Sequence, residues 1–155
     1  MKAIIVMGVS GSGKTTVGQL LASETGGTFL DGDNFHPPEN VAKMSSGTPL
    51  TDQDRQGWLE TLARIVHEAD SLTIIACSAL KASYRRILAE AEFVFLTGSA
   101  DLLAERINQR TDHYMPPGLL QSQLEALEVP ENTFTLDIKK PPRELVSGIR
   151  HHFGL

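Results

Sequence analysis

Eight residues near the start of the sequence have the types and the spacing of a loop that binds phosphate groups. The segment GVSGSGKT, residues 8–15, matches the pattern G-x-x-x-x-G-K-[ST] at every defined position. Glycines allow successive backbone N–H groups to turn inward around a phosphate, and a helix starting near Lys14 would add its positive end there. The Lys14 ammonium would contact the β- and γ-phosphates of ATP, and the Thr15 hydroxyl would ligate a bridging Mg²⁺ ion. The predicted nucleotide-binding residues of this segment are Gly8, Val9, Ser10, Gly11, Ser12, Gly13, Lys14, Thr15 and Thr16.

A pair of aspartates follows the second apolar run of the chain, in the segment FLDGD at residues 29–33. Phosphoryl transfer to a hydroxyl group needs one carboxylate beside that hydroxyl and another beside the metal ion or its waters. Asp31 and Asp33 would point the same way if the strand continued through both, and Gly32 would permit a bend or the close approach of a ligand. A solvated Asp-Gly turn is the alternative, but a phosphate loop expected nearby favours the catalytic interpretation.

Several basic residues fall at predicted strand ends or helix starts, and half of the 14 lysines and arginines belong to this group once Lys14 is included. In a chain with a formal net charge of −5, this grouping predicts a local positive site for phosphates and an anionic substrate. Surface solvation is the alternative for any single member. The residues are Lys43, Arg55, Lys81, Arg85, Arg106 and Arg110.

The segment QRTDHYMPPG, residues 109–118, separates two predicted helices and is rich in polar residues and proline. We predict a lid at approximately 110–118 that closes over ATP, excludes water and brings Arg110 against the transferred phosphoryl group. An ordinary connection between helices is the alternative. His36 and His113 have no cysteine or histidine partners at the spacing of a zinc site, so no zinc is expected.

These candidate residues need a framework, and the hydrophobic periodicity supplies one. Five short apolar runs alternate with segments of helical spacing, which predicts a parallel sheet covered on both faces, a three-layer α/β/α fold. The predicted strands are 2–7, 28–30, 72–77, 92–98 and 133–138. The predicted helices are approximately 15–27, 52–69, 79–90, 100–110, 118–128 and 142–153.

The carboxyl ends of the strands are where such a sheet binds ligands. The strand at 2–7 runs into the phosphate loop, and the strand at 28–30, expected to be its neighbour, runs into the two aspartates. Thr51 with Asp54 resembles a capping box, and Ser99 is a candidate N-cap. The helical stripe of Trp58, Leu59, Leu62, Ile65 and Val66 is interpreted as core packing.

Length, charge and cysteine content restrict the class of protein. A chain of 155 residues predicts a single domain, 1–155, and a net charge of −5 with a pI near 5.5 argues against general binding to nucleic acid or anionic membranes. The lone cysteine, Cys77, ends an apolar strand and is expected to be a buried small hydrophobe. Together with the absence of an 18-residue apolar run and of a basic leader, it favours a cytoplasmic location.

Four blocks of the sequence together resemble the gluconate kinase family, small P-loop kinases related in fold to shikimate kinase and nucleoside monophosphate kinases. The blocks are MGVSGSGKTTVG (7–18), FLDGDNFHPPENVAKMSSGTPLTDQDRQGWL (29–59), ACSALKASYRRIL (76–88) and RTDHYMPPGLLQSQLEALEVP (110–130). The resemblance implies transfer of the γ-phosphoryl group of ATP, with Mg²⁺, to the 6-hydroxyl of D-gluconate, and a homodimer.

The same resemblance assigns roles to individual residues. Asp33 would orient and deprotonate the sugar hydroxyl, Asp31 would belong to the metal shell, and Arg106 and Arg110 would serve the nucleotide and the lid. The substrate carboxylate must meet a cation, and Arg55 is favoured because its guanidinium can bind a carboxylate with two parallel hydrogen bonds. The residues expected to line the acceptor pocket are Asp33, His36, Lys43, Arg55, Lys81 and Arg85.

Two other functions remain open at this point. A kinase for another small acid, such as shikimate, would share the loop and the aspartates, but shikimate kinases carry a glycine triplet where this sequence has CSALK (77–81). A nucleotide-dependent switch without turnover is a candidate from a different class. The sequence has no N-K-x-D signature, and a switch would leave Asp31 and Asp33 without a purpose.

Overall fold

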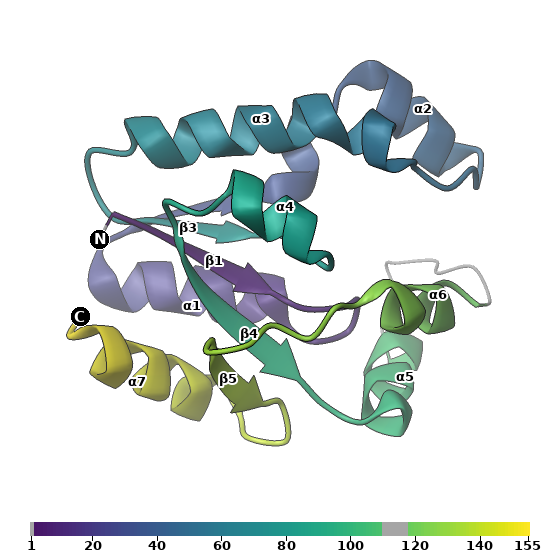
Figure 1. Ribbon diagram of the computed structural model, residues 1–155. Helices are drawn as coiled ribbons and strands as arrows, with labels where there is room; N and C mark the ends of the chain where they lie inside the picture. Colours follow the sequence, from purple (N-terminus) through teal and green to yellow (C-terminus); the bar gives the residue numbers. More distant parts are fainter. Residues whose placement is uncertain (1, 110–117) are drawn as a thin grey trace.

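The structure is a computed structural model that describes residues 2–109 and 118–155 (Figure 1). Strands and helices alternate along the chain as the periodicity predicts. In order, the elements are β1 (Ala3–Met7), α1 (Lys14–Thr25), β2 (Thr28–Asp31), the 3-10 helix η1 (Gly32–Phe35), α2 (Pro38–Ser45), α3 (Asp52–Glu68), β3 (Thr73–Ala76), α4 (Ala82–Ile87), β4 (Glu92–Thr97), α5 (Ala100–Asn108), α6 (Leu119–Ala126), β5 (Phe134–Asp137) and α7 (Pro142–Phe153).

The five strands form one parallel sheet in the order β2-β3-β1-β4-β5. The expectation that β1 and β2 are neighbours is wrong, because β3 lies between them. Asp31 at the end of β2 pairs in register with Ala76 of β3, which in turn pairs with Val6 of β1. Two strand spacings separate Asp31 from Val6, about 10 Å. The phosphate loop and the aspartates therefore still meet at the same carboxyl edge of the sheet.

Helices cover both faces of this sheet, which confirms the three-layer arrangement (Figure 1). Ile5 and Met7 of β1 pack with Trp58, Leu59 and other core residues on the face covered by α3 and α4. On the opposite face, Ile4 and Val6 of β1 pack against α1 and α7. The α3 stripe is buried as expected, with Ile65 only partly buried. Two apolar layers thus hold the strand ends, and the loops that extend from them, in fixed positions.

The local signals at the helix ends are confirmed. Thr51 and Asp54 form a reciprocal capping box at the start of α3, with Asp54 N donating to Thr51 Oγ1 at 3.0 Å and Thr51 N donating to Asp54 Oδ2 at 2.9 Å. Ser99 caps α5 by accepting from Leu102 N. Gly26 ends α1 in the left-handed conformation, with φ of 73°.

The region after β2 departs most from the predicted elements. The strand ends at Asp31, whose Oδ1 accepts a hydrogen bond from Asp33 N at 3.0 Å and turns the chain into η1. Pro37 and Pro38 then start α2, because proline is suited to the first helical positions. The helix expected at 79–90 is also shorter, because Ala79 has a φ of 47°, which lies outside the helical region.

Candidate active site

The phosphate loop has the backbone conformation that its sequence predicts. Gly8, Gly11 and Gly13 have φ values of 150°, 83° and 91°, and α1 begins at Lys14, directly after Gly13. A Cβ at Gly8 would lie 2.8 Å from the backbone oxygen of Leu96, and one at Gly11 would lie 2.9 Å from that of Leu103. The loop is therefore packed against β4 and α5. Gly8 and Gly11 are required by both conformation and space, whereas Gly13, with nothing within 4 Å of an added Cβ, is required by its conformation alone.

Polar groups of the loop are held by neighbours within the chain. The Lys14 Nζ atom donates to the backbone oxygen of Val9 at 3.0 Å, so the ammonium folds back over the loop. Ser10 N donates to Oε1 of Gln123 from α6 at 2.7 Å. Ser12 is 1% exposed, and its hydroxyl has no hydrogen-bond partner within the described part of the chain. A buried hydroxyl of this kind fits an anion nearby.

A cavity of about 260 Å³ opens beside the loop, between the starts of α1 and α7 and the end of α5. The side chain of Arg106 lines it and donates to the backbone oxygen of Ile138, which anchors the guanidinium at the end of the sheet. Arg106, predicted to serve the nucleotide, thus lies beside the phosphate loop. The lining residues are Gly11, Ser12, Gly13, Thr16, Val17, Arg106, Gln109, Pro142 and Leu145.

The two aspartates lie at the end of β2, but the strand does not continue through both of them as predicted. It ends at Asp31, and Asp33 belongs to the next element, η1. Asp33 sits in η1, with 76% of its side chain exposed. Its pKa is raised from the usual value, first because surrounding protein removes part of its hydration and second because Asp31 is close, while His36 and Lys14 act in the opposite direction. The exposure of the side chain keeps this effect modest. A Cβ at Gly32 would lie 2.7 Å from the backbone oxygen of Ala76, so only glycine fits this turn against β3.

His36 lies directly beside Asp33. Its side chain is 4% exposed and stacks on Trp58, with ring centroids 4.2 Å apart and an angle of 17° between the ring planes. The Nε2 atom is 3.9 Å from Asp33 Oδ1, and Nδ1 is 3.1 Å from Nδ2 of Asn40. Burial lowers the pKa of His36 and Arg55 lowers it further, while Asp33 opposes both effects. The ring is therefore expected to be neutral near pH 7.

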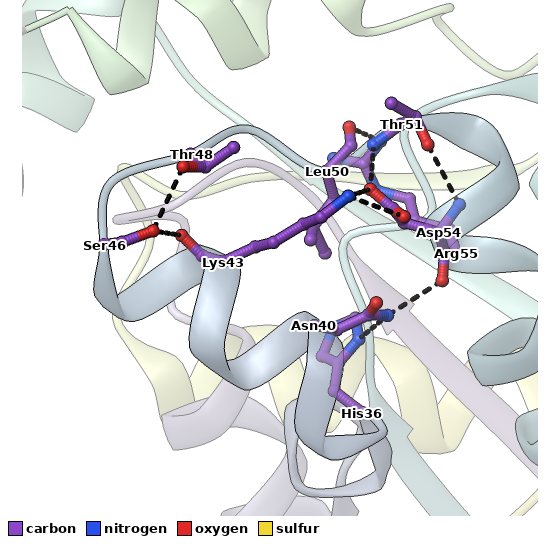
Figure 2. Close-up of polar contacts among 9 residues, drawn as sticks. All are labelled: His36, Asn40, Lys43, Ser46, Thr48, Leu50, Thr51, Asp54 and Arg55. Carbon is purple, nitrogen blue, oxygen red and sulfur yellow. Dashed lines mark hydrogen bonds and ion pairs between the residues drawn. The ribbon is translucent and has the colours of Figure 1, made fainter.

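Lys43 on α2 forms a bidentate contact with Asp54 at the start of α3 (Figure 2). Its Nζ atom donates to Asp54 Oδ1 at 2.9 Å and to Oδ2 at 2.8 Å. The hydrogen bond from Lys43, with those from the backbone and side chain of Thr51, lowers the pKa of Asp54 to about 2. The structure thus places Lys43 in a clamp between two helices, with its charge compensated there.

A second polar cluster joins α3 and α4. The Asp52 carboxylate accepts from Lys81 Nζ at 2.9 and 3.1 Å and from the Tyr84 hydroxyl at 2.5 Å. Arg55 Nη1 donates to the backbone oxygen of Leu50 at 2.8 Å and to the Tyr84 hydroxyl at 3.2 Å. Arg55 and Lys81 are therefore brought together around Tyr84, with one carboxylate already between the cations.

Arg85 has a different environment from the other predicted pocket cations. Its Nη1 atom donates to the backbone oxygen of Ala79 and its Nη2 atom to that of Glu128, each at 2.7 Å. The guanidinium connects the segment after β3 with the segment after α6. Arg85 therefore cross-links two backbone segments, and two of its N–H donors are already used in doing so.

Four contributors to the site were missed in the sequence. Tyr84 and Asp52 belong to quoted blocks but were not singled out, and Asn40 and Gln123 gave no signal of their own. Helical spacing does relate Tyr84 to Lys81, three residues earlier, and Asn40 to His36, four residues earlier. Arg110, His113 and all of the lid predicted at approximately 110–118 except Gly118, the N-cap of α6, lie outside the described residues.

Metal ligation by a dense cluster of side chains is not found in residues 2–109 and 118–155. No group of three or more histidine, cysteine, aspartate or glutamate residues there could hold a metal ion. Thr15 is exposed at the start of α1, and Asp31 is partly buried at the end of β2. Hydroxyl and carboxylate oxygens fit Mg²⁺, which is usually held by one or two protein oxygens together with phosphates and waters.

Comparison with known proteins shows the family of this chain. The family model described as shikimate kinase matches residues 10–134. The gluconokinase of Gluconobacter oxydans (strain 621H) is 44% identical over 160 residues, covering 97% of this chain and 90% of that protein. The thermosensitive gluconokinase of Escherichia coli (strain K12) is 42% identical, covering 84% of this chain and 73% of that protein. This chain belongs to the gluconokinase family.

Solved structures support the same family and fold. The crystal structure of a gluconokinase from Sinorhizobium meliloti 1021 superposes with a TM-score of 0.85 and 48% identity, over 94% of this chain and 87% of that one. The shikimate kinase of Aquifex aeolicus, at 18% identity and a TM-score of 0.65, shares the fold alone. The predicted gluconate kinase resemblance and the P-loop kinase fold are both confirmed.

Proposed function

We propose that this member of the gluconokinase family transfers the γ-phosphoryl group of ATP to the 6-hydroxyl of D-gluconate, giving 6-phospho-D-gluconate and ADP. The observation that carries the proposal is the position of Asp33 and the glycine loop at one carboxyl edge of the sheet. The gluconokinases compared are 42–48% identical to this chain over most of its length.

The nucleotide would bind with its phosphates inside the glycine loop and its base toward the cavity beside Arg106. Lys14 would exchange its contact with the Val9 backbone oxygen for contacts with the β- and γ-phosphate oxygens. Its positive charge would stabilise the γ-phosphoryl group during transfer. The backbone N–H groups of residues 8–16 and the positive N-terminus of α1 at Lys14 would supply the remaining stabilisation of the phosphates. Arg110 is proposed to meet the same phosphoryl group from the lid.

A Mg²⁺ ion would be held by the Thr15 hydroxyl, with Asp31 contacting the ion or its waters. When bound, the ion neutralises phosphate charge and orients the γ-phosphoryl group. Asp31 also accepts the hydrogen bond from Asp33 N that shapes η1. One side chain would thus couple the metal side of the site to the position of Asp33.

The acceptor hydroxyl would lie between Asp33 and the γ-phosphate. Asp33 takes the hydroxyl proton, the hydroxyl oxygen forms a bond to the γ-phosphorus, and the bond from that phosphorus to the β–γ bridging oxygen breaks to release ADP. The raised pKa of Asp33, caused first by loss of hydration and second by the nearby Asp31, makes this carboxylate a better proton acceptor.

The sugar acid would place its carboxylate near the cations of the second polar cluster. Arg55 is the preferred partner, because its guanidinium has donors beyond the two hydrogen bonds made by Nη1. Lys81 is close enough to contribute once its pairing with Asp52 relaxes. His36 lines the pocket beside Asp33, whereas Lys43 and Arg85 are proposed to support the pocket walls.

A homodimer and a cytoplasmic location complete the proposal. The dimer rests on the family resemblance. The location rests on the lone Cys77. This residue is 1% exposed, and burial raises the pKa of its thiol to about 12, as expected for an unreactive core residue. Among the described residues, no helix has the length and apolar character needed to cross a membrane.

Measurement of ADP release with a panel of sugar acids tests the proposed reaction. Gluconate should be phosphorylated in the presence of Mg²⁺, and Lys14→Ala should abolish the reaction while Lys140→Ala, at an exposed position after β5, leaves it unchanged. Turnover of shikimate but not of gluconate would show that the substrate is another small acid. ATP binding without turnover of any acid would favour the nucleotide-dependent switch.

A further inference from the structure

Asn40 is a buried polar residue on α2 that phosphate binding does not explain. It is 3% exposed, and its side chain lies between η1 and α3 (Figure 2). The Nδ2 atom is 2.8 Å from the backbone oxygen of Asp54 and 3.1 Å from Nδ1 of His36. A buried amide needs such partners, because leaving it without hydrogen bonds costs free energy.

The chemistry of the partners fixes the direction of both bonds. The backbone oxygen of Asp54 can only accept, so the amide nitrogen of Asn40 must face it. The second N–H of that nitrogen then meets His36 Nδ1, which must accept as well. A ring nitrogen that accepts carries no proton, so His36 is neutral and carries its proton on Nε2. A protonated ring would set two donors against each other.

The protonated Nε2 is the ring atom that faces Asp33, at 3.9 Å from Oδ1. A hydroxyl oxygen between the two atoms could lie about 2.8 Å from each. It would accept a hydrogen bond from His36 and donate one to Asp33. Stacking on Trp58, whose Nε1 donates to the Gly32 oxygen at 2.8 Å, holds the ring in this orientation.

We propose that Asn40 is a positioning residue that holds His36 as the Nε2–H tautomer, so that His36 and Asp33 together bind one hydroxyl group of the sugar acid. This inference deepens the proposed function and rests on it for the identity of the ligand. The charged groups acting on His36 are Asp33 from η1 and Arg55 from α3. Burial, the largest effect on the pKa of His36, favours the neutral ring that the hydrogen bonds require; Asp33 opposes it, and Arg55 favours the neutral ring as well.

The tautomer can be measured without any kinase activity. Two-bond correlation of ring protons and nitrogens by NMR, on the ¹⁵N-labelled full-length chain, distinguishes a protonated ring nitrogen from a bare one. The chain has 5 histidines, and comparison with His36→Gln identifies the signals of His36. We expect a neutral ring with the proton on Nε2 at neutral pH. A proton on Nδ1, or on both nitrogens, would overturn the inference whether or not gluconate is the substrate.

Reversal of the polarity at residue 40 tests its control over the ring. Asn40→Asp places an acceptor against His36 Nδ1, so a proton should appear there. Asn34→Asp puts the same charge on an exposed neighbouring residue and should leave the tautomer unchanged. A wild-type tautomer in Asn40→Asp would refute the positioning role.

Steady-state kinetics test the binding role, and do so even if Asn40→Asp fails to fold. His36→Leu removes the donor beside Asp33 and should raise the gluconate KM about tenfold, with an unchanged ATP KM. His36→Gln keeps an N–H group in that region and should recover most of the loss. Equal KM values for gluconate in the two variants, or a parallel rise in the ATP KM, would contradict the proposal.

Discussion

Replacement of Asp33 by asparagine is expected to slow phosphoryl transfer to gluconate by about 10²- to 10⁴-fold, the usual contribution of a positioned general base. This range corresponds to about 2.7–5.4 kcal/mol of transition-state stabilisation. The substitution keeps the shape of the side chain and the backbone N–H that donates to Asp31. What it removes is the negative charge and the ability to accept a proton.

Neither the fold nor ATP binding should suffer. The Asp33 side chain is 76% exposed, so its replacement leaves the core intact. Lys14 interacts with Asp33 electrostatically, which means that ATP would bind equally well or slightly better once a negative charge near the triphosphate is gone. Asp70→Asn, in the exposed segment before β3 at the opposite edge of the sheet, is the matched control.

The assay is steady-state ADP release with varied gluconate, combined with calorimetric titration of an ATP analogue. Loss of kcat with retained ATP affinity and an unchanged Tm is the expected pattern. Equal losses of turnover and ATP affinity would reject the assigned role of Asp33, as would full activity.

Three further changes test the supports of the site. Gly8→Ala should lower ATP affinity at least tenfold, because the new Cβ would lie 2.8 Å from the Leu96 backbone oxygen. Gly57→Ala is the control, because nothing lies within 4 Å of a Cβ at that position. Equal ATP affinities of the two variants in calorimetry would contradict the loop geometry. Trp58→Phe should lower the free energy of unfolding by about 1–2 kcal/mol, because the hydrogen bond from Trp58 Nε1 to the Gly32 oxygen is lost. Urea unfolding followed by circular dichroism measures this change, and an unchanged midpoint would argue against that hydrogen bond. Asp54→Asn should be less stable than wild type at neutral pH, with a difference that shrinks as the pH falls from about 4 through 2. The sign follows because a carboxyl whose pKa is lowered in the folded state stabilises above its unfolded pKa and loses this effect as the pH falls through its folded pKa. A difference that is as large at pH 2 as at neutral pH would contradict the Lys43–Asp54 clamp.

The sequence allowed the sheet and the phosphate loop to be predicted because both depend on local signals. Apolar runs such as residues 2–7 and 72–77 identify buried strands, and the glycine pattern at 8–15 identifies the loop conformation. The strand order could not be read in the same way. The position of β3 between β1 and β2 depends on how the helices pack over the whole sheet, which no short segment encodes.

The acceptor side of the site was predictable in composition but not in geometry. The sequence indicated that Lys43, Arg55, Lys81 and Arg85 are close to the site, yet the side-chain partners of these cations come from distant segments. Lys43 pairs with Asp54, and Lys81 pairs with Asp52, 29 residues away. Asn40 gave no sign of its role, because a buried asparagine becomes informative only when its two acceptors are known.

A structure of the chain with a non-hydrolysable ATP analogue, Mg²⁺ and gluconate would test the central claim most directly. The account predicts triphosphate oxygens within the Gly8–Thr15 loop and the gluconate 6-hydroxyl about 3 Å from an Asp33 carboxylate oxygen, in line with the γ-phosphorus. A complex with Asp33 turned to solvent, and with the gluconate carboxylate or another hydroxyl facing the γ-phosphate, would contradict it.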